Sequence, residues 1–378
     1  MIADCLAGVR VLDLSQYVPG PYATLLLSDL GAEVVKVEPP AGDPMRGLTP
    51  LAADGTSPVY AGLNRNKTVV RLDLKAADDR AVMEDLVRRA DVLLESYRPG
   101  VLDRLGFGPA ALAALNPRLV HCAVSGFGQT GPLRLRAGHD NTYMALAGAL
   151  AVTGSEEAPL APFPPLADHA SAMNAVIAIL AALVRRGRTG QGARLDLSIY
   201  ESALALQYHS LLTLGIADNE RGRGLLNGAA AYYRIYRCAD GGFMALGAIE
   251  PKFWRDFCVT VGREDWVARQ GDAFPQTALI ADVAAVLASQ DRDGWVARFE
   301  GVDCCFEPVL SPAEAAAHPQ AGARGMVALL PDGTAEPLFP VTADDAPPPA
   351  RRPLREVSAV AVRDAWAAAD GGLGATLA

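Results

Sequence analysis

Residues 8–38 read GVRVLDLSQYVPGPYATLLLSDLGAEVVKVE, and this stretch decides the fold class. Its two ends, residues 9–14 and 32–37, are short apolar runs rich in valine and leucine, a composition that favours strands. Between them a Pro-Gly-Pro break precedes a helical stretch over 22–30, which Gly31 ends. The order strand, helix, strand predicts parallel pairing with a right-handed crossover.

The same alternation of strands and helices continues through the first 125 residues and predicts a Rossmann-like α/β domain. Its further elements are a helix at 77–89 and strands at 68–72, 91–94 and 119–124. The middle of the chain is more helical. Its longest predicted helix covers 168–186 and begins at Asp168, which is suited to the N-cap position.

A polar stretch at 217–227 predicts a linker, and a β-hairpin predicted over 232–248 introduces a smaller α+β domain. We therefore expect a large domain at 1–215, completed by about 328–378, and a linker with a small domain at 216–327.

The composition excludes several classes of protein. The chain has 378 residues, of which 51% are apolar, so it has ample material for a core and is not disordered. A net charge of −9 argues against nucleic-acid binding. The longest apolar run is too short for a membrane span, and no secretory signal is recognisable. The six cysteines lack metal-site spacing, so we expect reduced thiols, no bound metal and a cytoplasmic location.

Residues 126–131 read GFGQTG and follow a predicted strand. A dinucleotide site would need a helix to start there, whereas Pro132, Arg134 and Arg136 come next. The motif therefore predicts a tight loop beneath an active site.

Basic residues lie close to several predicted strands. Lys36 lies near the end of one, Asn64, Arg65 and Lys67 precede another, and Arg98 follows a third. Arginine and lysine at the edge of a parallel sheet suit a polyphosphate, although each alone is more typical of a solvated loop.

His139 and Asp168 are the candidate catalytic residues. His139 lies between the glycine loop at 126–131 and a predicted helix, and Asp168 is at the start of the most apolar predicted helix of the chain. Free N–H groups at a helix start stabilise an oxyanion as readily as a carboxylate, although an aspartate there is also a common structural cap.

Taken together, these segments resemble the family III CoA-transferase superfamily over nearly the whole chain. The opening stretch, YRPGV at 97–101 and GFGQTGP at 126–132 match the superfamily. GHDN at 138–141 and GAIEP at 247–251 are similar to its α-methylacyl-CoA racemase branch. The resemblance implies an interlocked homodimer whose active sites lie between the large domain of one chain and the small domain of the other.

The resemblance also implies roles for individual residues. His139 and Asp168 would exchange the α-proton of a 2-methyl-branched acyl-CoA thioester on opposite faces, through an enolate stabilised by a backbone N–H at Asp168. Glu250 would orient His139, and Asp140 would support Asp168. Coenzyme A, brought as part of the substrate with no other cofactor, would be bound by Lys36, Asn64, Arg65, Lys67, Arg98 and Tyr233.

Two alternatives remain open. In the CoA-transferases of the superfamily the aspartate at the Asp168 position is a nucleophile, so Asp168 does not separate the two chemistries. Arg234, and the HASA sequence at 169–172 in place of glycines, depart from the racemase pattern. Arg234 could meet a substrate carboxylate and would suit transfer of CoA on a dicarboxylic acid. The other alternative is a non-catalytic protein that binds CoA thioesters.

Overall fold

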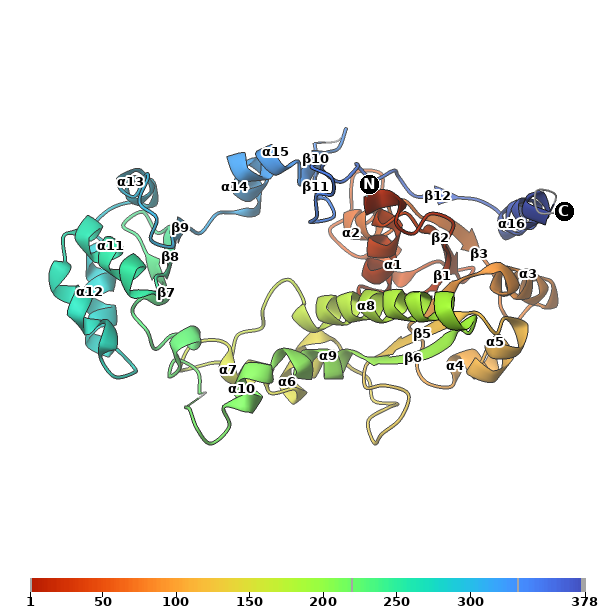
Figure 1. Ribbon diagram of the computed structural model, residues 1–378, viewed down its shortest axis with the longest axis horizontal. Coiled ribbons are helices and arrows are strands. Elements are labelled where there is room, and N and C mark those ends of the chain that lie inside the picture. Colours follow the sequence, from red (N-terminus) through yellow and green to blue (C-terminus); the bar gives the residue numbers. More distant parts are fainter. Residues whose placement is uncertain (1, 219, 332, 375–378) are drawn as a thin grey trace. The chain divides into compact units, whose positions relative to one another are not determined.

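The computed structural model describes residues 2–218, 220–331 and 333–374 (Figure 1). The chain divides into two compact units. The first contains residues 1–146, 164–205 and 318–378, and the second contains residues 147–163 and 206–317. Compared with the predicted division, the second unit also takes residues 147–163 and 206–215, whereas residues 318–327, predicted in the small domain, belong to the first unit.

The first unit is built on a seven-stranded sheet in the order β12-β3-β2-β1-β4-β5-β6. Every pairing in it is parallel. The strands are β1 (Arg10–Leu14), β2 (Glu33–Glu38), β3 (Thr68–Arg71), β4 (Val92–Glu95), β5 (Val120–Ser125), β6 (Ala193–Ser198) and β12 (Arg355–Glu356). The predicted Rossmann-like α/β class is confirmed. The strand order reverses direction between β1 and β4, which is where sheets of this kind bind ligands.

Helices cover both faces of this sheet (Figure 1). One face carries α1 (Pro19–Asp29) and α8 (Leu166–Thr189), which contact each other. On the other face, buried side chains of β1, β2, β3 and β4 form one core with those of α3 (Ala77–Arg89), α5 (Pro109–Leu115) and α16 (Ala359–Gly374). The remaining elements of this unit are α2 (Pro58–Leu63), α4 (Val101–Arg104), α6 (Asp140–Leu146), α9 (Ile199–Leu206), α15 (Pro319–Arg324), β10 (Val327–Leu329) and β11 (Ala335–Pro337), with short 3-10 turns at Ile2–Asp4 and Pro44–Gly47.

By length and composition α8 is long and apolar enough to cross a membrane. It packs against α1, β5 and β6, however, as the core helix of a globular domain does. Its predicted start at Asp168 is wrong by two residues, because the helix begins at Leu166.

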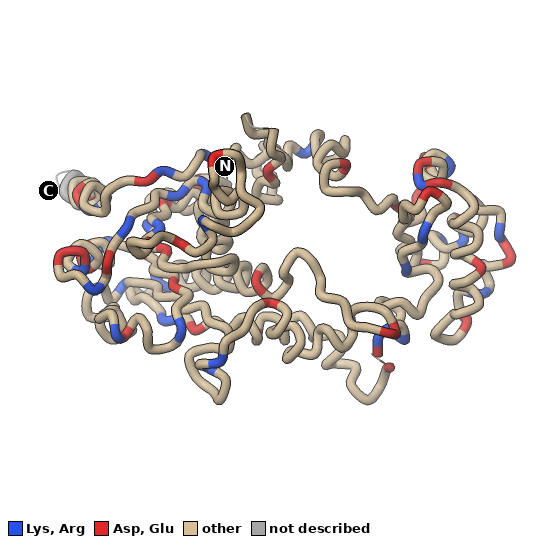
Figure 2. Tube along the Cα trace, turned by 180° about the vertical axis from the view of Figure 1, so that it is seen from behind, with Lys and Arg blue, Asp and Glu red and all other residues tan. Residues whose placement is uncertain are grey.

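The second unit is smaller and mixed. Its sheet has three antiparallel strands, β7 (Tyr233–Arg237), β8 (Phe243–Gly247) and β9 (Phe306–Pro308). A second core of aromatic side chains, among them Trp254, Phe257 and Trp295, packs beneath it. The helices of this unit are α7 (Ala149–Val152), α10 (Tyr208–Leu212), α11 (Pro251–Val261), α12 (Thr277–Leu287), α13 (Arg292–Arg298) and α14 (Pro312–Ala317), with 3-10 turns at Leu225–Asn227 and Glu264–Gly271. Acidic and basic residues are interspersed through both units (Figure 2).

A buried ion pair lies between the sheet and α1. Lys67 Nζ is 3.1 Å from Asp13 Oδ2, and both side chains are fully buried. Lys67 also donates hydrogen bonds to Thr24 Oγ1 at 2.8 Å, Pro21 O at 2.8 Å and Asn64 Oδ1 at 3.0 Å. Burial lowers the pKa of Lys67 to about 8 even though Asp13 opposes the shift. Because the ammonium group is satisfied on every side, it joins β3, β1 and α1 at one point.

A second buried lysine belongs to the same network. Lys36 Nζ is 2.9 Å from Asp43 Oδ2 and donates to Ser15 O at 2.8 Å. Burial alone would raise the pKa of Asp13, but Lys67 and Lys36 together hold it well below its usual range. The carboxylate of Asp13 is therefore ionised in the protein interior.

We predict that Lys67→Ala lowers the free energy of unfolding by about 3–5 kcal/mol, because it removes the ammonium group that pairs with the buried Asp13 carboxylate and leaves that charge only hydrogen bonds and the more distant Lys36. Denaturant titration measures this. The control is Arg88→Ala, which removes exposed ion pairs to Glu84 and Asp85 and is expected to cost less than about 1 kcal/mol. Equal losses in the two variants would contradict the structural importance of the buried pair.

Candidate active site

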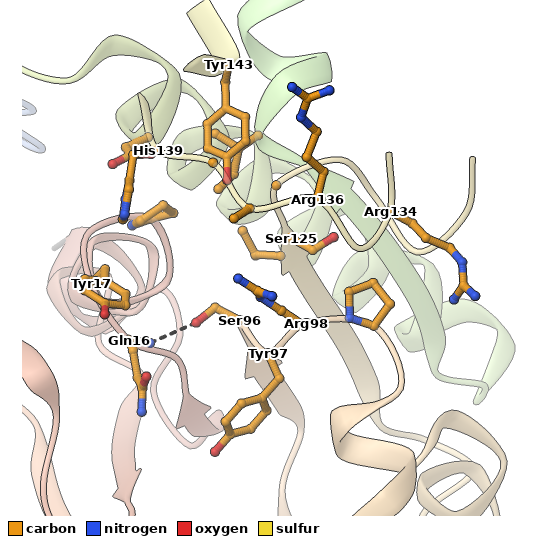
Figure 3. A pocket seen from close by; sticks show the side chains of 18 of the residues that line it. Gln16, Tyr17, Ser96, Tyr97, Arg98, Ser125, Arg134, Arg136, His139 and Tyr143 are labelled. Atoms are coloured by element: carbon orange, nitrogen blue, oxygen red, sulfur yellow. Dashed lines mark hydrogen bonds between the residues drawn. The ribbon is translucent and has the colours of Figure 1, made fainter. Parts of the chain in front are cut away.

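A cavity of 490 Å³ opens at the carboxyl ends of β1, β4 and β5 (Figure 3). The loop after β1 contributes Gln16 and Tyr17, and the loop after β4 contributes Ser96, Tyr97 and Arg98. The Gln16 N–H donates to Ser96 Oγ at 2.9 Å and so connects the two loops. The cavity thus occupies the reversal point of the strand order, where the two loops diverge.

His139 and Asp168 both line this cavity. His139 is exposed and directly precedes α6, whereas Asp168 is half-buried in the first turn of α8. Burial raises the pKa of the Asp168 carboxyl to about 6, and the charge of Asp140 adds to this shift, while His169 and His139 oppose it. The cavity therefore holds a carboxyl group that titrates close to neutral pH beside an accessible imidazole.

Asp140 caps α8 from another helix. Its Oδ1 accepts hydrogen bonds from the N–H of Ala167 at 2.7 Å and of Asp168 at 3.1 Å. The prediction that Asp168 is the N-cap is therefore wrong. The prediction that a backbone N–H at this helix start faces an enolate stays a prediction, although Asp140 already accepts from the N–H groups of Ala167 and Asp168. The cap comes from 28 residues earlier in the chain, so the local pattern around Asp168 could not reveal it.

Tyr143 lines the cavity and explains two of its glycines. A Cβ at Gly126 would lie 2.4 Å from the Tyr143 hydroxyl, and one at Gly138 would lie 2.6 Å from its ring. Burial, with a contribution from Asp168, raises the pKa of Tyr143 to about 12, so its phenol stays protonated. The segment 126–131 forms a loop with no helix start, as the sequence predicts.

Three arginines reach the same cavity: Arg98, Arg134 and Arg136 (Figure 3). Of these, only Arg98 was predicted as a ligand-binding residue. Arg134 and Arg136 alternate with the exposed Leu135 just after the glycine loop, and this alternation next to a loop motif was the available signal. All three are exposed and can meet a charged ligand.

Most of the other predicted coenzyme A ligands lie elsewhere. Lys36, Asn64 and Lys67 are buried in the polar network beneath α1, so their predicted contact with phosphate is wrong for this structure. Arg65 is 3.2 Å from Glu336, and its predicted role in binding stays a prediction. The local sequence around a lysine near a strand end does not show whether its side chain faces solvent or the interior.

Glu250 and Tyr233 belong to the second unit. Glu250 is exposed at the N-cap position of α11. Tyr233 lines a separate cavity of 960 Å³ together with Arg234 and three glutamates, Glu156, Glu157 and Glu307. The Arg234 guanidinium donates a hydrogen bond to the Gly228 carbonyl oxygen. The predicted roles of Glu250 and Tyr233 stay predictions.

Comparison with known proteins identifies the family. The family model of CoA-transferase family III matches residues 6–354. The chain belongs to CoA-transferase family III. The predicted family is thus confirmed, and its match extends over both units.

The relatives in this family include two kinds of enzyme. The human alpha-methylacyl-CoA racemase is 37% identical over 325 residues, which cover 85% of this chain and 81% of the relative. The acetyl-CoA:oxalate CoA-transferase of Acetobacter aceti is 33% identical over 356 residues, which cover 92% and 91% of the two chains. A crystal structure of a CAIB/BAIF family protein from Brucella suis superposes with a TM-score of 0.82 at 28% identity, covering 96% of this chain and 99% of that one.

Proposed function

We propose that this family III protein is an acyl-CoA racemase that inverts the α-carbon of a 2-methyl-branched acyl-CoA. The observation that carries the proposal is the pairing of His139 with Asp168 in one cavity, where the pKa of Asp168 is raised to about 6. The similarity to alpha-methylacyl-CoA racemases supports it. Racemisation needs two unlike groups that each alternate between protonated and deprotonated forms, and these two side chains meet that need.

In the proposed reaction one of the two groups removes the proton α to the thioester carbonyl, and an enolate forms. The other group then delivers a proton to the opposite face, which inverts the centre. Glu250 is proposed to orient His139, and burial together with the Asp140 charge raises the pKa of Asp168 and so keeps part of it protonated. The reaction as proposed uses no cofactor apart from the coenzyme A carried by the substrate.

The second candidate is CoA transfer, and the observation that favours it is a carboxylate at the edge of a ligand cavity in a chain that also resembles CoA-transferases. Asp168 would attack the acyl-CoA thioester, expel the CoA thiolate and form an acyl-aspartyl anhydride. Binding of a dicarboxylic acyl group at Arg234 has little support, because that guanidinium is engaged by Gly228 and its cavity carries three glutamates.

We further propose that the substrate's phosphates bind at Arg98, Arg134 and Arg136, because these exposed arginines line the cavity that holds His139 and Asp168. Each of Arg98→Ala and Arg134→Ala is expected to weaken acetyl-CoA binding about threefold to tenfold, and added salt should weaken it further. Calorimetry measures both effects. Arg88→Ala, an exposed arginine on α3, is the matched control and should bind as the unmodified chain does; binding that ignores salt and Arg98 would contradict the site.

We also propose a homodimer with the interlocked arrangement that the family resemblance implies. Large apolar side chains are exposed along α8, including Met173, Ile177 and Val184, and this area suits a protein interface. The expected result of sedimentation equilibrium at assay concentration is a dimer, because these side chains would otherwise face water. A folded, active monomer would contradict it.

The decisive experiment follows the α-hydrogen. We expect a 2-methyl-branched acyl-CoA to take up solvent deuterium at the α-carbon. Asp168→Asn should abolish inversion, because one face loses its proton carrier, and His139→Ala should abolish inversion while sparing exchange from the face that Asp168 serves. Nuclear magnetic resonance of the recovered thioester measures uptake. A CoA-transferase would instead be inactivated by hydroxylamine at Asp168 during turnover and would tolerate His139→Ala.

The pH dependence of α-hydrogen exchange tests whether Asp168 acts as the base. Where Asp168 is the base, exchange should fall as the pH drops through about 6, because the carboxylate becomes protonated. Asp140→Asn can still cap α8 through its amide oxygen but lacks the charge that raises the pKa of Asp168, so the fall should move to lower pH. Because burial is the larger cause of the raised pKa, an unshifted profile in Asp140→Asn would contradict only the contribution of the Asp140 charge, and a profile unchanged in Asp168→Asn would show that Asp168 is not the titrating base.

A further inference from the structure

Tyr17 has an unusual backbone conformation. It lies in the loop between β1 and α1, and its φ is +65°, in the left-handed region that glycine, asparagine and aspartate tolerate best. For a bulky aromatic residue this conformation is a clear outlier. Such strain persists only where the surrounding structure imposes it, and it gathers at functional sites.

Packing of the hydrophobic core does not explain the residue. The Tyr17 side chain is 48% exposed and projects into the cavity of the candidate active site. Its neighbour there is His139, whose ring meets the Tyr17 ring edge-on, with centroids 6.1 Å apart and planes at 78°. Figure 3 shows the two side chains on the same side of the cavity.

An aromatic neighbour such as Tyr17 can orient the His139 imidazole. Among the residues that the structure describes, none forms a hydrogen bond with its ring nitrogens, and the side chain is exposed. Thr142 fixes only the main chain of His139, through its N–H and carbonyl groups. An edge-on aromatic contact favours one orientation of the ring and shields one side of it from water.

We propose that Tyr17 is a positioning residue that holds the His139 imidazole in its orientation within the cavity. The strained backbone places the ring where a relaxed conformation would not. The expected effect of Tyr17 on catalysis rests on the proposed racemase function, whereas the ring contact between Tyr17 and His139 does not. The ring contact and the effect on catalysis are therefore measured in separate experiments.

The first measurement is the chemical reactivity of His139. Diethyl pyrocarbonate modifies accessible neutral imidazoles, and mass spectrometry of peptides follows each histidine. Tyr17→Asn keeps a residue suited to the left-handed conformation but removes the ring, so modification of His139 should be about two- to tenfold faster. The exposed His209 is the internal reference and should not change. Tyr17→Phe retains the ring and should react as the unmodified chain does.

The second measurement separates positioning from a structural role. In Tyr17→Asn, kcat for α-hydrogen exchange should fall about tenfold or more with little change in KM, while Tyr17→Phe keeps its activity. The melting temperature of Tyr17→Asn should stay within about 2 °C of the unmodified value or rise, because the strained conformation is relieved.

Unchanged His139 reactivity in Tyr17→Asn, or a marked fall in its melting temperature, would overturn the positioning role. If reactivity rises as expected but the unmodified enzyme exchanges no α-hydrogen, the contact is supported and the racemase function is overturned instead. Loss of exchange in Tyr17→Phe would also overturn the proposal, because it would assign the effect to the phenol hydroxyl rather than to the ring.

Discussion

The buried ion pair between Lys67 and Asp13 is the constraint on which the rest of the first unit depends. It joins the residue before β3 to the middle of the sheet and to the first turns of α1. Asp13 also accepts hydrogen bonds from the N–H and hydroxyl of Ser15, at the start of the loop that carries Tyr17. The charges are expensive to bury but have several partners, so they fix a single path for this loop. This network of buried charges therefore determines the path of the loop that forms one wall of the cavity, although its charged side chains do not line the cavity.

Asp140 couples the stability of α8 to the chemistry of the cavity. Its carboxylate satisfies two free N–H groups at the start of the helix, and the same charge contributes to the raised pKa of Asp168. An apolar helix start without this cap would leave buried donors unpaired. One side chain thus serves both purposes, and this explains why an acid follows His139 directly in the chain.

The sequence was informative where the signal is local. The apolar runs predicted every strand from β1 to β5 to within one or two residues, and the motifs predicted the family. It was misleading for Lys36 and Lys67, because a lysine beside a strand can point to either face, and only the packed structure shows that both point beneath α1. It also missed Arg134 and Arg136, whose alternation with Leu135 in a loop is a weak signal, and the Asp140 cap, which depends on a contact distant in sequence.

The pKa of Asp168 bears on the choice between the two chemistries. A carboxyl group with its ordinary pKa of 3.8 is protonated at pH 7 in fewer than about one molecule in a thousand, whereas with a pKa of about 6 roughly one in ten carries the proton. An acyl-transfer nucleophile acts only as the carboxylate, so the protonated fraction would be idle in that reaction. A proton carrier needs both forms, since it receives the proton in one direction and donates it in the other. Burial and the neighbouring Asp140 therefore supply the protonated form that a proton carrier needs, while most Asp168 groups remain carboxylates that could also act as a nucleophile.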